Sequence, residues 1–419
     1  MIDLDRWQEI FIALKQNKLR SFFTAFGVFW GIFLLVIMLG SGNGLENGTR
    51  IGMGDMATNS FFIWTQRTTI PYKGYPRGRF FNYNNKDTEA LKENIPEIEY
   101  IAPRIGGFGR TGDNVVRGER VASFNIQGDY PAYNLIDPMN ILQGRFINQK
   151  DIEEKRKVAV IGSRVVTELF TPQENPIGEY LMINGVYCKV VGVVSSKKNS
   201  QQAQQENQVI YLPFTTVQKV YNLGDIVGFY SITSKPGVPA SVLEQKIREF
   251  LKERHAIHPD DKRAIGSFNV ENQFKKMSQL FAGINGLIWI VGTGTLLAGV
   301  IGVSNIMLIV VRERTKEIGV RRALGASPTN IITQVIYESV FLTTLAGYLG
   351  LVVGVAILEG VNFILAQFPS ENTMFANPTV DFNKALVALA VLVISGIIAG
   401  IIPAKRAVKI RPIEALHDE

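Results

Sequence analysis

The chain has 419 residues, and 44 Lys and Arg against 37 Asp and Glu give it a formal net charge of +7. Charged residues make up 19% of the sequence, below the roughly 25% that is usual in soluble domains. A polar block over residues 40–276 contrasts with several uncharged apolar runs, which excludes a simple soluble enzyme, a disordered chain and a fibrous repeat. The single cysteine, Cys188, excludes an internal disulfide and a cysteine-based metal site.

The N-terminal segment predicts a membrane anchor. Residues 1–21 carry apolar residues at helical spacing, which predicts a cytoplasmic amphipathic helix on the membrane surface or a plain extension of the first span. Residues 22–39 contain no charge and approach the length of about 20 residues that a spanning helix needs. We interpret them as an anchor rather than a cleaved signal peptide, because the region before them is longer than the N-terminal region of a signal peptide usually is. The glycine-rich residues 40–44 are expected to form a flexible exit.

Residues 40–276 predict a large outer domain of alternating strands and helices. Two βαβ-like units, at residues 59–106 and 223–276, flank a β-rich block at residues 107–222. Within that block Asn184-Gly185 predicts a hairpin turn, and Cys188 a buried strand residue.

Two polar stretches of this domain are interpreted as loops. The Gln-rich residues 195–208 predict a mobile loop. His255 and His258 resemble a metal pair only loosely, and we interpret them as part of a solvated loop.

Three further apolar runs complete a set of four transmembrane helices. Residues 277–311 carry no charge and would form a helix of about 52 Å, so part of it should project from the bilayer as a stalk. Residues 331–358 and 385–404 form the third and fourth spans, joined by a short outer loop at 359–384. The expected fold class is therefore a membrane protein with four transmembrane α-helices and a large α+β extracytoplasmic domain.

Small and acidic residues mark positions inside these spans. Two GxxxG motifs allow backbones to approach closely in lipid, either within the chain or between subunits. They consist of Gly350, Gly354, Gly396 and Gly400. Glu338 is the one charged residue of the third span. An intramembrane acid is a functional candidate, although this one is also placed to snorkel or to pair with an arginine of the preceding loop.

The distribution of Lys and Arg predicts the orientation. Basic residues concentrate in residues 1–21, 312–330 and 405–419, whereas the loop at 359–384 holds only Lys384. This pattern places both termini and the 312–330 loop in the cytoplasm and residues 40–276 outside. A nucleic-acid partner is not expected, because we find no basic patch interleaved with aromatic residues.

The 312–330 loop predicts a short charged helix that could carry force between a soluble partner and the spans. Side-chain pairs at i, i+3 and i, i+4 support the helix, a C-cap is expected at its end, and an N-cap is expected at the start of the next helix. The residues concerned are Arg314, Glu317 and Arg321 for the pairs, and Gly325, Ser327 and Pro328 for the caps. The alternative is a solvated loop whose charge serves only topology.

The sequence contains no GxxxxGK[ST], GxSxG or HExxH motif, so neither a P-loop nor a familiar catalytic or metal centre is predicted. We expect a noncatalytic chain that binds no cofactor or metal itself and takes its energy from a partner.

Several motifs carry a family resemblance. Residues 312–327 (RERTKEIGVRRALGAS), 334–339 and 403–416 (PAKRAVKIRPIEAL) resemble the FtsX-like permease family. The outer-domain motifs LQGRFINQKD (142–151), VAVIG (158–162), PIG (176–178) and VVGVV (190–194) resemble the MacB-type periplasmic core domain. The chain differs from the fused MacB arrangement because no ATP-binding domain precedes the first span, which implies a separate ATPase subunit.

The resemblance implies a permease of the type VII ABC transporters. In these proteins ATP hydrolysis moves the outer domains through the stalk helices, a process called mechanotransmission. The implied partners are a separate ABC ATPase subunit using ATP and Mg, a second permease subunit (homodimer or paralogue), a periplasmic adaptor, an outer-membrane channel and membrane lipid. The implied location is the cell inner membrane. Residues 59–106 and 223–276 would be Porter-like, and residues 107–222 Sabre-like.

Three functions remain open on the sequence. They are MacB-like efflux or export, LolC-like lipoprotein release, and FtsX-like control of cell-wall hydrolases. The large outer domain disfavours the last. In each transporter function, the residues expected to couple to the ATPase are Glu317, Arg321, Arg322, Arg314 and Gly325, and Gly325 is expected to matter for shape rather than contact.

Overall fold

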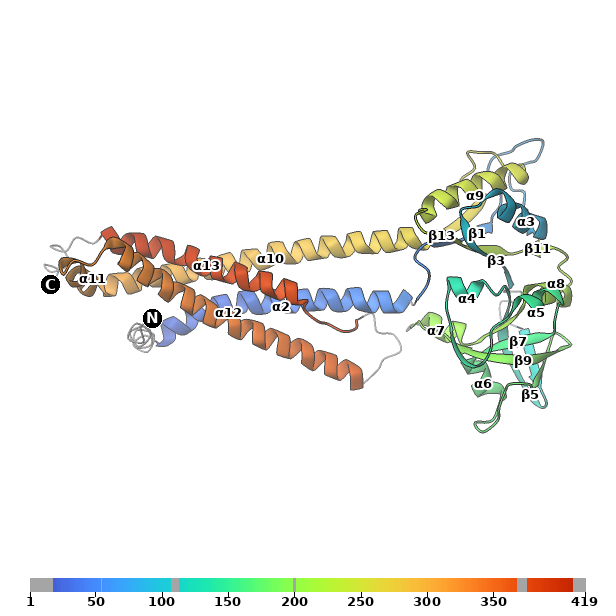
Figure 1. Cartoon of the computed structure of the whole chain (residues 1–419), viewed down its shortest axis with the longest axis horizontal. Coiled ribbons are helices and arrows are strands. Elements are labelled where there is room, and N and C mark those ends of the chain that lie inside the picture. The colour runs from blue at the N-terminus through green and yellow to red at the C-terminus, as the bar shows by residue number, and fades with distance from the viewer. Residues whose placement is uncertain (1–17, 54, 107–112, 199–200, 368–374, 410–419) are drawn as a thin grey trace. The chain divides into compact units, whose positions relative to one another are not determined.

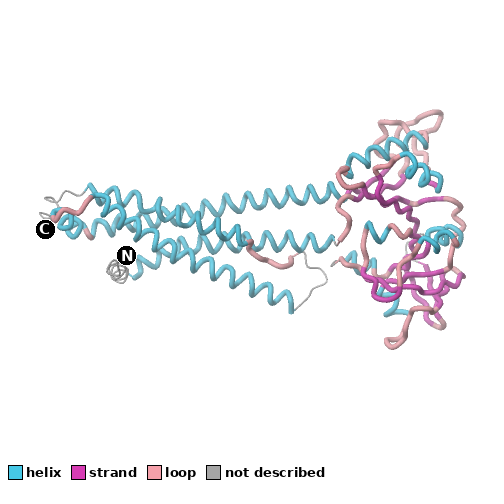
Figure 2. The backbone as a smooth tube through the Cα atoms, viewed as in Figure 1, coloured by secondary structure: helices cyan, strands magenta, loops and turns pink. Residues whose placement is uncertain are grey.

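The computed structural model describes residues 18–53, 55–106, 113–198, 201–367 and 375–409. Most of the predicted amphipathic helix, residues 1–17, lies outside these ranges. The chain divides into a helical unit and a sheet unit, the latter formed mainly by residues 50–279 (Figure 1). Strands occur in the sheet unit, and the helical unit consists of long helices and their connections (Figure 2).

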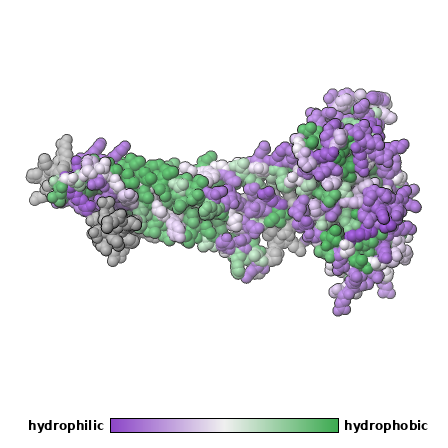
Figure 3. Space-filling model, viewed as in Figure 1, coloured by the Kyte–Doolittle hydropathy of each residue, from purple (hydrophilic) through white to green (hydrophobic). Residues whose placement is uncertain are grey.

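Four helices in the described part of the chain are long and apolar enough to cross a membrane, which confirms the predicted number of spans. Each extends beyond the apolar run that predicted it. Their bounds are α2 Lys18–Met53, α10 Val270–Glu313, α12 Pro328–Gln367 and α13 Phe382–Lys409. Apolar side chains dominate the visible surface of their central portion (Figure 3).

Helix α10 is continuous over 44 residues, or about 66 Å. It begins at the residue after strand β13 (Ile265–Asn269), so no loop separates the two elements. The side chain of Asn269 accepts a hydrogen bond from the backbone N–H of Asn272 at 2.9 Å, which caps the helix start. The predicted stalk and second span are therefore parts of one helix.

The glycine-rich residues 40–44 are helical, so the expectation of a flexible exit is wrong. They lie in the middle of α2, where the missing side chains make room for neighbours. A Cβ atom at Gly44 would lie 2.7 Å from the ring of Phe375. Between the glycines, Asn43 donates to the carbonyl of Thr379 and accepts from Lys384, both at 2.8 Å. These glycines therefore serve close packing rather than flexibility.

The sheet unit contains a four-stranded antiparallel sheet in the order β3-β12-β1-β13. The strands are β1 Ser60–Thr65, β3 Ile98–Gly106, β12 Phe229–Ser234 and β13, connected through helices α3 Asn85–Asn94 and α9 Ala240–Arg254. Each predicted βαβ unit is present, but a strand of the other unit lies between its two strands. The two units therefore interleave in one sheet, as in the ferredoxin-like split βαβ arrangement.

The middle block forms a separate β-rich lobe. Six strands pair in a closed ring, β5-β10-β7-β9-β8-β4 and back to β5, with β6 pairing along β9. They are β4 Asp113–Arg117, β5 Arg120–Asp129, β6 Asn140–Gly144, β7 Val158–Gly162, β8 Tyr180–Ile183, β9 Val186–Ser195 and β10 Val209–Pro213. Asn184 and Gly185 both have positive φ, 46° and 77°, which confirms the predicted hairpin turn.

Short elements complete this unit. The helices are α4 Tyr133–Ile136, α5 Gln149–Glu153, α6 Ser163–Leu169, α7 Gln201–Glu206 and α8 Phe214–Val220, and the strands β2 Tyr83–Asn84 and β11 Ile226–Val227 form a small pair. The lobe joins the sheet where β3 pairs with β5, and a buried ion pair between Arg104 and Asp129 lies beside this junction.

Of the two loops predicted in this unit, one is wrong and the other is correct in part. Residues 195–208 include α7, and Lys198 in the same stretch is buried and pairs with Asp137 at 2.8 Å. His255 and His258 do lie in the loop that follows α9, but His255 is mostly buried, and its Nε2 lies 2.8 Å from Asp87 Oδ2 on α3. Cys188 is fully buried, as predicted. Among the described residues, no group of three or more potential ligands could hold a metal ion.

Candidate coupling site

The 312–330 loop folds into helix α11, Thr315–Ala323, between the end of α10 and the start of α12. Its C-terminal end has both hydrogen bonds of a Schellman motif, from Gly325 N–H to Arg322 at 3.1 Å and from Ala326 N–H to Arg321 at 3.0 Å. Gly325 has a φ of 96°, which a glycine adopts without strain. Both predicted caps are confirmed, because Ser327 accepts from the backbone of Asn330 at 3.4 Å at the start of α12.

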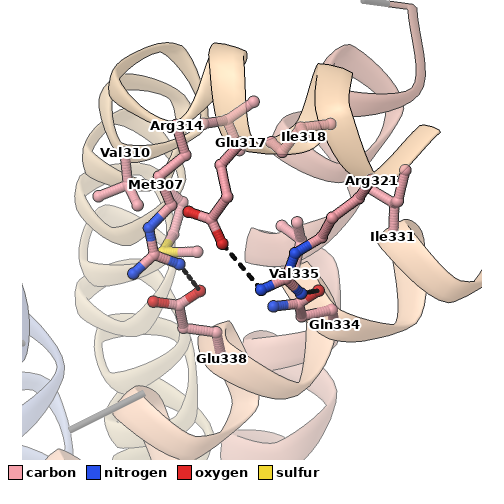
Figure 4. Close-up of a pocket in the computed structure, with 11 residues that line it drawn as sticks. Met307, Val310, Arg314, Glu317, Ile318, Arg321, Ile331, Gln334, Val335 and Glu338 are labelled. Atoms are coloured by element: carbon pink, nitrogen blue, oxygen red, sulfur yellow. Dashed lines mark hydrogen bonds and ion pairs between the residues drawn. The ribbon is translucent and has the colours of Figure 1, made fainter. Parts of the chain in front are cut away.

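Arginines fasten α11 to the neighbouring helices (Figure 4). Arg314 pairs with Glu338 of α12 at 3.4 Å, as expected for an arginine of the preceding loop, and not with Glu317 as its i, i+3 spacing suggested. Arg321 pairs with Glu317 at 2.8 Å, as predicted, and also donates to the Gln334 side chain of α12 at 3.3 Å. Figure 4 shows these side chains converging between α11 and α12.

Arg322 connects α11 to the fourth spanning helix. Its guanidinium donates to the backbone carbonyl of Val408 in α13 at 2.6 Å. Together with Arg314 and Arg321, it lies on the half of α11 that carries Ile318, since these four residues fall within about 100° of one another at 100° per residue. The arginines predicted to dock onto a partner therefore face the chain's own helices.

Apolar packing supports the same face of α11. Ile318 packs against a core cluster that joins Val311 of α10 to Ile331 and Val335 of α12. The cavity between these helices measures about 30 Å³. Ligand pockets usually measure about 300–1,000 Å³, so this site suits mechanical contact rather than the binding of a small molecule.

The opposite face of α11 carries residues that the sequence analysis missed. Val320 is 43% exposed and Leu324 at the end of the helix is 84% exposed, with the exposed Lys316 one turn before Val320. The spacing i, i+4, i+8 puts these three on one stripe. The sequence could have indicated this exposed face. At helical spacing Ile318 lies on the side of α11 opposite to Val320 and Leu324, so one of these apolar sides had to be exposed.

The glycine motifs of the spans meet other helices of the same chain. Gly350 and Gly354 of α12 pack closely against α2. A Cβ atom at Gly350 would lie 2.5 Å from the carbonyl oxygen of Phe29. Gly396 and Gly400 of α13 pack on α12, where a Cβ atom at Gly400 would lie 3.1 Å from Ser339 Oγ. These contacts hold the helix to which α11 is fastened.

Known proteins give the context for this arrangement. Residues 21–250 match the family model of the MacB-like periplasmic core domain, and residues 289–412 match that of the FtsX-like permease C-terminal region. The chain is 28% identical over 96% of its length to a pyoverdine export ATP-binding/permease protein, PvdT, of Pseudomonas entomophila, and 26% identical over 98% to a macrolide export ATP-binding/permease protein, MacB, of Bdellovibrio bacteriovorus. It spans only 58% and 61% of the lengths of these two relatives.

A solved structure also resembles part of the chain. The periplasmic region of MacB from Actinobacillus actinomycetemcomitans matches with a TM-score of 0.43 and 22% identity, covering 53% of this chain and 94% of that one. With a core-domain model over more than half of its residues and the permease model over its C-terminal helices, the chain belongs to the MacB/FtsX-like family of ABC transporter permeases.

Proposed function

We propose that this chain is the permease subunit of an ABC exporter in the cell inner membrane, with both termini in the cytoplasm and the sheet unit in the periplasm. ATP hydrolysis, with Mg, takes place in a separate ATPase subunit. The permease acts as a dimer, with itself or a related chain, and hands substrate to a periplasmic adaptor and an outer-membrane channel. The printed names of PvdT and MacB, both export proteins, support export over lipoprotein release or hydrolase control.

The observation that carries this proposal is the two-sided construction of α11. One face is fastened to α12 and α13 by Arg314, Arg321 and Arg322, while Val320 and Leu324 are exposed on the other. A helix that is capped at its C-terminal end, is followed at once by the capped start of α12 and makes three side-chain contacts to neighbouring helices moves as a rigid piece. Contact with the ATPase on its exposed face is then passed directly to the spanning helices.

This geometry gives the exposed residues and the inward-facing residues of the site two different roles. Leu324 and Val320, with Lys316 and Glu317 beside them, contact the ATPase, because their side chains are exposed. The arginines transmit the movement without touching the partner, because they reach Glu338, Gln334 and the Val408 carbonyl. Gly325 matters for the turn, since its positive φ strains any residue with a Cβ atom.

Two pairs of variants test the proposal. Leu324→Asp should insert normally but lose the ATPase complex, with Asn330→Ala, exposed one turn into α12, as its control. The double variant Arg321→Glu/Arg322→Glu should keep most of the complex and its ATP turnover but lose transport, and Arg321→Lys/Arg322→Lys should be intermediate, because lysine lacks the planar fork. Complex formation, ATP turnover and transport are measured for each. The proposal fails if Leu324→Asp and the Glu variant both match the parent in all three assays.

A further inference from the structure

One loop of the sheet unit combines basic and aromatic residues on its surface. Residues 66–82, between β1 and β2, contain four basic residues and no acidic one. The aromatic residues Tyr75 and Phe80 are 47% and 58% exposed, and Arg67, Lys73 and Arg77 are exposed beside them. This is a basic patch interleaved with aromatic residues, so the expectation that the chain has none is wrong.

The neighbouring loop adds to the positive charge. Lys262 and Arg263 are exposed in the segment that holds the base of the 66–82 loop. Asp260 is the exposed acid of this segment, and Asp261 is fully buried. The net charge of the exposed surface here is therefore positive, which favours a partner of opposite sign.

The base of the loop is built rigidly although it belongs to no sheet. The buried carboxylate of Asp261 accepts hydrogen bonds from Thr69 N–H at 2.6 Å, from Thr69 Oγ1 at 2.8 Å and from Ile70 N–H at 3.1 Å. Although burial opposes its ionisation, these bonds hold the pKa of Asp261 below its usual range. The carboxylate therefore remains charged and keeps the loop in place.

The tip is ordered by its own contacts. Tyr72 and Tyr75 exchange backbone hydrogen bonds around a Lys73-Gly74 turn in which both residues have positive φ. Arg79 stacks on the Tyr75 ring at 4.1 Å and donates to the carbonyl oxygens of His255 and Ala256. A preformed loop loses little conformational entropy when it binds.

From these observations we propose that the 66–82 loop is a docking element for an acidic surface of an extracytoplasmic protein. Arginine and aromatic side chains are the residues enriched at the centres of protein–protein interfaces, which favours a protein over a lipid or nucleic acid. The strand order gives a second reason. The loop leaves β1 at Thr65, which pairs with Ile265, whereas α10 follows the other end of β13, where Phe61 pairs with Asn269. The loop thus begins at the end of the sheet opposite to the junction with α10.

The proposal rests on the outward placement of the sheet unit in the proposed function, so the experiment first tests that placement. Lys235→Cys puts an exposed thiol in the sheet unit, and an impermeant maleimide added to intact spheroplasts should label it. The native thiol does not interfere, because burial raises the pKa of Cys188 to about 11. Absence of labelling overturns the placement itself, whereas labelling with a failed crosslink overturns only the docking element.

The docking test uses the full chain in its native membrane. The photoreactive amino acid p-benzoylphenylalanine is placed at Phe80 and, as a control of similar exposure in the lobe, at Tyr187. We expect a protein adduct at position 80 whose crosslinked surface is rich in Asp and Glu. The yield of the adduct should fall about tenfold in Arg77→Glu and change less than about twofold in Arg77→Lys. Replacing the acidic residue of the partner by lysine should restore the yield in the Arg77→Glu variant.

The remaining outcomes count against the proposal. One group concerns the partner: an adduct with lipid, with nucleic acid, with a second copy of this chain, or with a protein surface that lacks acidic residues. The other group concerns the yield: an adduct yield at position 80 that Arg77→Glu leaves unchanged, or that does not exceed the yield at position 187. Because crosslinking needs no ATP turnover, these outcomes do not depend on the coupling role of α11.

Discussion

Replacing Gly350 by alanine should loosen the packing of α12 against α2. The new Cβ atom would lie 2.5 Å from the Phe29 carbonyl oxygen and 3.2 Å from the Phe33 nitrogen. Both are backbone atoms, so no side-chain rotation relieves the clash. A carbon atom and a carbonyl oxygen normally keep at least about 3.3 Å, so the two helices must separate by roughly 0.8 Å.

The matched control is Gly360→Ala in the same helix, where a Cβ atom meets nothing within 4 Å. Both substitutions gain about 1 kcal/mol of helix propensity, so their difference isolates the close approach. Overpacking costs about 1–3 kcal/mol, and Gly350→Ala should be less stable than Gly360→Ala by that amount. The free energy of unfolding is measured by reversible denaturation in mixed micelles.

Concentration separates the two interpretations of the glycine motif. Packing within the chain predicts the same difference at every protein concentration, whereas a subunit interface predicts a difference that changes with concentration. Equal stabilities for Gly350→Ala and Gly360→Ala would refute the argument from the close approach.

Two further predictions concern buried carboxylates. Burial opposes the ionisation of Asp87, but hydrogen bonds from His255, Arg254 and the Asn84 backbone outweigh it and lower the pKa of Asp87. This carboxylate therefore stabilises the fold above about pH 4, and its contribution is lost as the pH falls through its folded-state pKa. The Asp87→Asn variant should have a lower unfolding temperature at pH 7, and that temperature should decline less steeply in acid than it does for the parent. The control Asp225→Asn, at an exposed position, should behave like the parent. Glu338→Gln should lower the free energy of unfolding in micelles by about 1–3 kcal/mol, because it weakens the contact with Arg314. The control Glu359→Gln, at an exposed position, should lower it by less than about 0.5 kcal/mol. Equal effects of the two substitutions would contradict a structural role for the Arg314–Glu338 pair.

The apolar runs predicted the number of spanning helices but not their lengths. Hydropathy reports where a helix contacts lipid, and a helix that continues through polar sequence gives no such signal. Helix α2 therefore runs to Met53, well past the predicted end at residue 39, and α10 begins at Val270. The glycines at 40–44 suggested a break because glycine weakens isolated helices, whereas tight contact with Phe375 and other neighbours explains them.

Strand pairing was beyond the reach of local patterns. The two βαβ-like units and the β-rich block between them were predicted in their correct places, but β1 pairs with β12, which joins Ser60 to Thr233. No local feature of either strand indicates which distant strand it pairs with, so the interleaving of the two βαβ units could not be predicted. The hydrogen bond between His255 and Asp87 was missed for the same reason, since it joins the end of α9 to α3, far apart in sequence.

At the candidate site the sequence predicted the helix, the cap at its end, the cap at the start of the next helix and the Glu317–Arg321 pair, but not which face turns inward. Helical spacing tells which residues share a face, and the packing partners on α12 and α13 decide which face is buried. Since Arg321 and Arg322 share a face with Ile318, positive charge alone would have directed every test of coupling to the side of α11 that packs on the chain's own helices. Substitutions on the two sides should have different consequences: on the Leu324 side they remove the contact, and on the arginine side they leave the contact but disconnect it from the membrane.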